Sequence, residues 1–149
     1  MKMTATEILK NDHKEAMGLI ERLESTDTGS GAGGSKEELF GKLRDALKLH
    51  TKEEEQVFYP ALENFDETRD LIKESYKEHR KVDQLLAEMN PAAGDFADML
   101  SELRRNIEHH VDEEEGEMFP KAEQLLGQAR LQEMGQQIEQ MKKGQSATA

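Results

Sequence analysis

The spacing of apolar residues is the feature that most restricts how this chain can fold. In four stretches of about 20 residues, apolar side chains recur every three or four positions, which places them on one face of an α-helix. No stretch alternates apolar and polar residues for long, and β-branched residues are sparse. The pattern therefore predicts an all-α protein.

Helix breakers divide the chain into five predicted helices. The stretch Ser25–Ser35 is typical of a flexible linker, because no strand precedes it and no Lys follows its last Gly as in a phosphate-binding loop. Pro60 and Pro120 are expected to kink or end their helices, and residues 90–94 form another break. We expect helices from Thr4 or Thr6 to Glu24 and over residues 36–59, 67–89, 95–119 and 122–141.

Helices of this length match an up-down-up-down antiparallel four-helix bundle, with an additional C-terminal helix that caps or extends it. We expect a single domain over residues 1–143, with its core at about 5–126 and a flexible tail over 144–149.

Charge and residue content exclude several classes of protein. The chain has 32 acidic and 20 basic residues, a formal net charge of −12 at pH 7, and no separate basic cluster, which argues against a nucleic-acid partner. No apolar run reaches the roughly 18 residues of a membrane span, and none forms a signal peptide. We therefore expect no membrane partner and a cytoplasmic location. Because the chain lacks cysteine, any metal must be bound by histidine and carboxylate side chains.

Four of the five histidines lie on the apolar faces of the predicted helices, one on each long helix. His13 and His79 each lie seven residues from an apolar neighbour, which returns nearly to the same face. His50 and His110 continue the apolar lines of their helices, whereas His109 lies about 100° round the helix from its neighbour and should face away.

The second and fourth predicted helices repeat one another at an offset of 60 residues. The segment HTKEEEQVFYP begins at His50 and aligns without a gap on HVDEEEGEMFP, which begins at His110. The aligned register places Glu54 and Glu114 four residues after these histidines, on the same inward face. The remaining glutamates of the two EEE runs are expected to be solvated. Two such helix pairs related by a pseudo-twofold would bring both H-x-x-x-E units to one site.

A single inward histidine is more often a hydrogen-bonded core residue than a metal ligand, but four histidines together with two glutamates favour a metal centre. Buried carboxylates need compensation, and a cation supplies it. Six nitrogen and oxygen ligands are too many for one tetrahedral ion and suit two ions bridged by carboxylates. Ligation without sulfur favours iron or manganese over structural zinc, although it leaves zinc open.

At these residues the sequence resembles the hemerythrin-like, or HHE cation-binding, family of non-haem di-iron proteins over roughly residues 5–126. The family pattern H…HxxxE…H…HxxxE is matched by His13, His50, Glu54, His79, His110 and Glu114. The resemblance implies two iron ions bridged by Glu54 and Glu114 and by an oxo or hydroxo group, with the four histidines as terminal ligands. Ferritin-like di-iron proteins use E-x-x-H pairs, and two such pairs are not found on the apolar faces.

The sequence departs from the classical oxygen-carrying hemerythrins. Those proteins have an H-x-x-x-H pair on the third helix, whereas Ser75 and Asp83 flank His79 here, and they end the fourth with H-x-x-x-x-D rather than H-x-x-x-E. One coordination position is thus left to water, an exogenous ligand or a side chain such as Tyr76. This departure disfavours reversible oxygen carriage and leaves room for peroxide or nitric oxide chemistry.

We therefore expect a di-iron protein that binds or processes dioxygen, peroxide or nitric oxide, in stress defence or in oxygen or redox sensing. The alternatives are a catalase- or peroxidase-like enzyme, an iron-responsive or storage module, and a helical interaction protein without metal.

Overall fold

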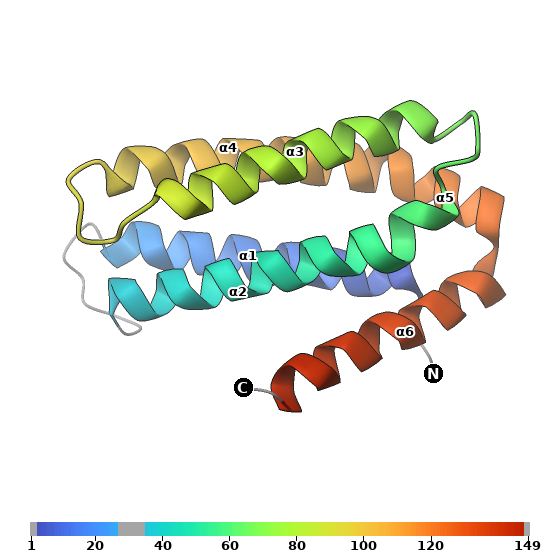
Figure 1. The fold of residues 1–149 in the computed structure, drawn as a ribbon, viewed down its shortest axis with the longest axis horizontal. Helices are drawn as coiled ribbons and strands as arrows, with labels where there is room; N and C mark the ends of the chain where they lie inside the picture. The colour runs from blue at the N-terminus through green and yellow to red at the C-terminus, as the bar shows by residue number, and fades with distance from the viewer. Residues whose placement is uncertain (1–2, 27–34, 148–149) are drawn as a thin grey trace.

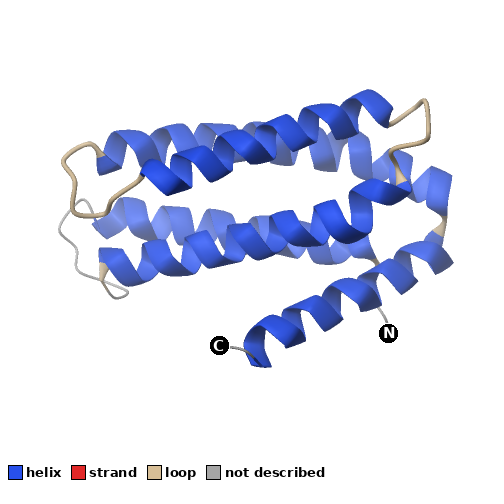
Figure 2. Cartoon of the chain, in the orientation of Figure 1, coloured by secondary structure: helices blue, strands red, loops and turns tan. Residues whose placement is uncertain are grey.

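A computed structural model of the chain describes residues 3–26 and 35–147, and all the regular structure in these ranges is helical (Figure 2). The prediction of an all-α protein is confirmed for these residues. The elements are α1 (Ala5–Thr26), α2 (Lys36–Glu53), the π-helical η1 (Glu54–Phe58), the 3₁₀ turn η2 (Tyr59–Ala61), α3 (Arg69–Glu88), α4 (Phe96–Glu113), the π-helical η3 (Glu114–Met118), α5 (Phe119–Leu126) and α6 (Gln128–Ala147).

The four long helices α1 to α4 lie side by side, and the chain reverses direction from each to the next (Figure 1). Contacts join α1 to α2, α2 to α3, α3 to α4, and α4 back to α1. Helix α6 lies outside this group and contacts α1, α2, α5 and η1. No described helix combines the length and apolar character that crossing a bilayer requires.

The apolar core consists of two clusters at different levels of the bundle. One cluster includes Leu23, Leu39, Leu86 and Phe96, near the ends of the helices where α1 is followed by α2 and α3 by α4. The other includes Leu9, Phe58, Ile72 and Phe119, and α6 contributes Leu131, Met134 and Ile138 to it. Between the two levels, each long helix carries a buried histidine.

Two π-helical segments interrupt the bundle at equivalent points. Segments η1 and η3 each begin at the glutamate of the H-x-x-x-E unit, Glu54 and Glu114. A π-turn holds an extra residue and therefore shifts the inward face relative to a continuous α-helix. Phe58 and Tyr59 are fully buried as a result, whereas Val57, which α-helical spacing places inward, is only partly buried.

The prediction that Pro120 ends the fourth helix is wrong. Pro120 lies in the first turn of α5, where the missing N–H of proline is tolerated, and the chain stays helical to Leu126. The break comes at Gly127, whose φ of 81° is the one positive value among the described residues. The predicted boundary near Ala122 therefore lies within a helix.

The other boundaries differ by a few residues. Ser25 and Thr26, which we expected in the linker, belong to α1, and residues 27–34 of that linker lie outside the described residues. Ser35 caps α2 by accepting a hydrogen bond from the Glu38 N–H at 3.1 Å. Helix α6 runs to Ala147, past the predicted end at about residue 141.

Helix α6 approaches the start of α1 at Gly135. A Cβ atom at this position would overlap the carbonyl oxygen of Met3 and lie 3.1 Å from the carbonyl carbon of Thr4. Only glycine therefore permits this approach of the two backbones. Helix α6 then runs obliquely past the bundle (Figure 1), and Lys142 in its C-terminal half contacts Asp12 of α1 and Glu53 of α2.

Candidate metal centre

The structure brings the six predicted site residues together between the two apolar clusters. His13, His50, His79 and His110 come from α1, α2, α3 and α4, and each is no more than 8% exposed. Glu54 and Glu114 are completely buried. Ligand atoms of His13, His50, Glu54 and Glu114 lie within 4.8 Å of one another, as do those of Glu54, His79 and His110. Glu54 is common to both groups.

All four imidazoles present Nε2 to the two glutamates. His13 Nε2 lies 3.0 Å from Glu114 Oε1, and His79 Nε2 lies 3.0 Å from Glu54 Oε1. Nε2 atoms of His50 and His110 lie 3.2 Å from the glutamates four residues later in their own helices. The α1–α2 and α3–α4 pairs thus supply equivalent side chains to one centre, as the sequence repeat predicts.

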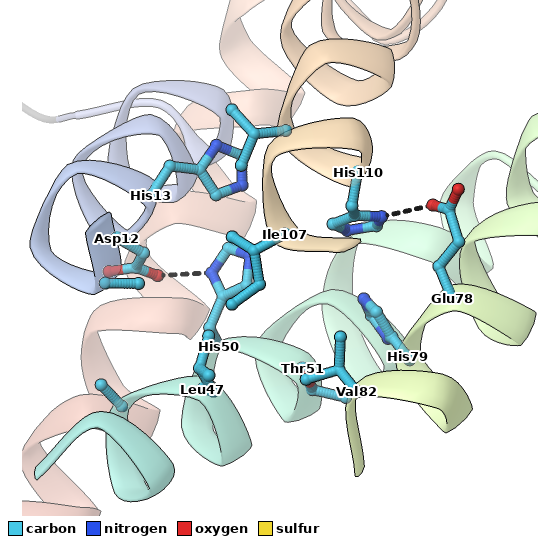
Figure 3. Close-up of a pocket in the computed structure, with 13 residues that line it drawn as sticks. Asp12, His13, Leu47, His50, Thr51, Glu78, His79, Val82, Ile107 and His110 are labelled. Atoms are coloured by element: carbon cyan, nitrogen blue, oxygen red, sulfur yellow. Dashed lines mark hydrogen bonds and ion pairs between the residues drawn. The ribbon is translucent and has the colours of Figure 1, made fainter. Parts of the chain in front are cut away.

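The opposite ring nitrogen of each histidine meets a carboxylate from another helix. His50 Nδ1 lies 2.9 Å from Asp12 Oδ2, and His110 Nδ1 lies 2.6 Å from Glu78 Oε1. A carboxylate on Nδ1 favours a proton there and leaves the Nε2 lone pair directed at the centre. Figure 3 shows both contacts, with His13 and His50 on one side and His79 and His110 on the other.

The expectation that the other glutamates of the EEE runs are solvated is wrong for Glu53. The side chains of Glu55 and Glu115 are 36% and 37% exposed, but each contacts a histidine of the centre. Glu115 Oε2 lies 2.7 Å from His13 Nδ1, and Glu55 Oε2 lies 2.7 Å from His79 Nδ1. Glu53 is completely buried. A helical wheel shows which residues of one helix face the core of the protein. The histidine partners of Glu55 and Glu115 lie on other helices, so these contacts depend on how neighbouring helices are rotated.

Unpartnered polar atoms at the centre fit a cation. His50 Nε2, His110 Nε2 and Glu54 Oε2 are buried and have no hydrogen-bond partner among the described residues. Each such atom costs about 1 to 3 kcal/mol when it is removed from water and left unpaired. Metal ions placed among them would accept the nitrogen and oxygen lone pairs and balance the two buried carboxylates.

The electrostatics of the centre without metal show the same demand for positive charge. Burial opposes protonation of His50, but Glu54 and Asp12 raise its pKa to about 10. Burial also opposes protonation of His110, but the nearby Glu114 carboxylate outweighs burial and raises the pKa of His110 well above its usual value. Protons on these imidazoles and metal ions therefore compete for the same Nε2 atoms.

The chain was compared with known families, proteins and structures. The model of the hemerythrin HHE cation binding domain matches residues 4–122. This chain belongs to that family. A crystal structure of a hemerythrin HHE cation binding domain-containing protein from Mycobacterium kansasii superposes with a TM-score of 0.80 and 26% identity, over 97% of this chain and 89% of that one.

Curated relatives have a similar level of sequence identity to this HHE domain. An uncharacterized Mycobacterium tuberculosis protein is 28% identical over 91% of this chain and 83% of its own length. A DNA nickase of Nostoc is 27% identical over 78% of this chain, and an uncharacterized hemerythrin-like protein of Schizosaccharomyces pombe is 29% identical over 65%. The matches cover only 33% of the nickase and 50% of the yeast protein.

Tyr59 is a residue of the HHE centre that sequence reasoning missed. Its hydroxyl donates to Glu114 Oε2 at 2.7 Å and lies 3.2 Å from both Glu54 Oε1 and His79 Nε2. Tyr76, the side chain we expected near the free position, instead donates to Glu63 at the surface. The repeat contained the signal, because Tyr59 aligns with Phe119, whose ring stacks on His13 with centroids 5.9 Å apart.

A small cavity borders the imidazoles of this HHE domain. It has a volume of about 30 Å³ and is lined by the four buried histidines and by apolar side chains that include Leu47, Val82 and Ile107 (Figure 3). That volume holds one or two water-sized molecules. A diatomic or similarly small ligand therefore fits beside the candidate centre.

Proposed function

We propose that this HHE domain is a non-haem di-iron protein that binds or processes dioxygen, peroxide or nitric oxide. The observation that carries the proposal is the arrangement of four histidines and two buried glutamates in two adjoining groups of ligand atoms that share Glu54. Three of their atoms have no hydrogen-bond partner among the described residues. Six such ligands suit two ions, and nitrogen and oxygen donors suit iron.

In this arrangement His13 and His50 would hold one iron, and His79 and His110 would hold the other. Glu54 and Glu114, which lie between the two histidine pairs, would be shared by both ions. Bound irons supply the electrons for binding or reducing a small oxidant. Manganese and zinc use similar ligands, so metal analysis decides between them.

The remaining roles belong to the protein. The carboxylates on Nδ1 hold the imidazole rings in place and increase their basicity. The apolar walls of the cavity restrict its contents to small, weakly hydrated molecules. The Tyr59 hydroxyl holds a proton at the two glutamates, where burial, Glu114 and Glu54 raise the pKa of the phenol well above its usual value.

The experiment that tests the proposal is metal analysis of three proteins after anaerobic loading with ferrous iron and removal of loosely bound metal. We expect two irons per chain in the wild type and in His109→Ala, and fewer in His110→Ala. His109 is the matched control, because it neighbours His110 in sequence but its side chain is 66% exposed. A wild type that retains no iron would refute the proposal.

Peroxide turnover is the second candidate, and Tyr59 favours it. Disproportionation converts two hydrogen peroxide molecules to two water molecules and one dioxygen, and it requires protons to move between oxygen atoms at the centre. Tyr59 is a buried hydrogen-bond donor that can position a proton there, whereas Phe119 on the other side has no hydroxyl. Steady oxygen release from peroxide, abolished in His50→Ala and reduced in Tyr59→Phe, would support this activity. Stoichiometric consumption without oxygen release would contradict it.

A further inference from the structure

A second group of possible ligands lies beside the centre, where α3 and α4 meet the solvent. His109 Nε2 lies 3.3 Å from Glu78 Oε2 and 3.2 Å from Glu113 Oε1. One ligand atom from each of these three residues lies within 4.8 Å of the other two. Because the His109 side chain is 66% exposed, an ion in solution can reach this group directly.

Glu78 provides an independent sign that the group lacks a partner. This residue is only 8% exposed, and its Oε2 atom is buried without a hydrogen-bond partner among the described residues. The atom faces His109, whose Nε2 is close but does not form a hydrogen bond with it. A buried carboxylate oxygen is costly when unpaired, and a cation held by His109 and Glu113 would satisfy it.

The equivalent position in the α1–α2 half contains a lysine of the protein itself, although the Glu53 oxygens, like Glu78 Oε2, have no hydrogen-bond partner among the described residues. There Asp12 and Glu53 take the places of Glu78 and Glu113, and Lys142 from α6 lies 2.8 Å from Asp12 Oδ1 and 3.0 Å from Glu53 Oε2. Leu49 aligns with His109, so that half has no imidazole at this point. Only the α3–α4 half combines a carboxylate pair with an accessible metal-binding side chain.

Glu78 also connects this surface group with the interior. Its other oxygen, Oε1, lies 2.6 Å from His110 Nδ1, and the residue lines the cavity beside the four buried histidines (Figure 3). One carboxylate thus has one oxygen at the candidate centre and the other at the surface group. An ion bound outside is separated from the centre by this side chain and His110.

We propose that Glu78, His109 and Glu113 form an uptake site, where a divalent cation binds before it reaches the buried centre. One imidazole nitrogen and two carboxylate oxygens suit Fe²⁺, Mn²⁺ or Zn²⁺, with water at the remaining positions. The uptake role rests on the proposed function, because it requires that the interior binds metal. Exchange of water for the protein ligands is the only chemistry involved, so no oxidant or reductant takes part.

The test compares wild type with His109→Ala and His109→Lys, using Zn²⁺ as the probe. Lysine supplies a positive charge but is not expected to bind Zn²⁺ when protonated, so it separates a metal ligand from a simple counter-charge. With two irons already bound, we expect the wild type to take up one further Zn²⁺ in equilibrium dialysis and both variants to take up none. Glu102→Gln, an exposed change on the same helix α4, is the control and should retain the third ion.

Loading kinetics provide the second arm of the test. When metal-free protein is mixed with ferrous iron, we expect both His109 variants to load at least severalfold more slowly than wild type but to reach the same two irons. Unchanged loading, or a third ion retained in His109→Lys, would overturn the proposal. Absence of iron from the interior of every protein would instead refute the proposed function, so the two failures are distinguishable.

Discussion

The α1–α2 half of the molecule surrounds its inner histidines differently from the α3–α4 half. In the first half, Lys142 of α6 forms ion pairs with Asp12 and Glu53, so α6 covers these two carboxylates. In the second, the corresponding Glu78 and Glu113 meet His109, which is open to solvent. The inward side chains of the two halves repeat one another, so the difference arises outside them.

The two halves also differ at one aromatic position beside the centre. Tyr59 directs a hydroxyl at both glutamates, whereas Phe119 stacks on His13 without a polar contact. Although Tyr59 follows α2 in sequence, its ring stacks on His79 of the α3–α4 half, whereas Phe119, which follows α4, stacks on His13 of the α1–α2 half. The half that α6 covers is therefore apolar at this position, and the half with the exposed His109 has the hydroxyl. The repeated histidines and glutamates thus have chemically different surroundings in the two halves.

The largest effect is expected from the two glutamates that we propose to bridge the irons, where the halves should behave alike. Glu54→Gln and Glu114→Gln each keep the side-chain volume but remove a buried carboxylate that the proposed centre requires. We expect either variant to lose both irons, from two per chain to near zero, as measured by metal analysis after ferrous loading. Loss of a single iron in one variant would show that its glutamate serves one half only.

The second largest effect should distinguish the two halves by their stability when Lys142 or His109 is replaced. Lys142→Met removes the lysine from Asp12 and leaves the buried Glu53 without its ion-pair partner, and we expect a loss of roughly 2 to 4 kcal/mol in the free energy of unfolding. His109→Ala, the matched change in the exposed half, should cost less than about 0.5 kcal/mol. Urea denaturation of the metal-free proteins measures both values, and equal losses would contradict the comparison.

The docking of α6 on the first half can be tested without changing any charge. Gly135→Ala places a methyl group against the Met3 backbone, so α6 must shift. We expect the free energy of unfolding, measured by urea denaturation, to fall by about 1 to 3 kcal/mol. Gly18→Ala in α1 is the control, because nothing lies within 4 Å of its Cβ position. That change should stabilise the protein by about 0.5 to 1 kcal/mol. A neutral Gly135→Ala would mean that α6 does not rest on α1.

The smallest predicted effect concerns the aromatic pair. Tyr59→Phe makes the two aromatic positions alike, and we expect it to weaken iron affinity about tenfold, or about 1.4 kcal/mol, because the contacts with Glu54 and Glu114 are lost. Competition with a chelator measures the affinity. Leu125→Ala, on α5 and outside the centre, is a control that should leave iron affinity unchanged.

Sequence reasoning succeeded where the information was local. Helical periodicity placed His50 and His110 on inward faces, and the repeat selected His110 over its neighbour His109, as the structure has them. The same reasoning failed at Pro120. This proline lies in the first turn of α5, where a helix tolerates the missing N–H, so the chain stays helical past it. It also failed at Val57, because the π-turn at η1 shifts the inward face.

The sequence by itself determined the helices and the six inward side chains, since both follow from spacing along a single segment. Only the tertiary structure decided their partners. Glu115 reaches His13 across 102 positions of sequence, and Lys142 reaches Asp12 across 130. Such contacts depend on how each helix is rotated and placed against the next, which the collective packing of the bundle sets and spacing within one helix does not record.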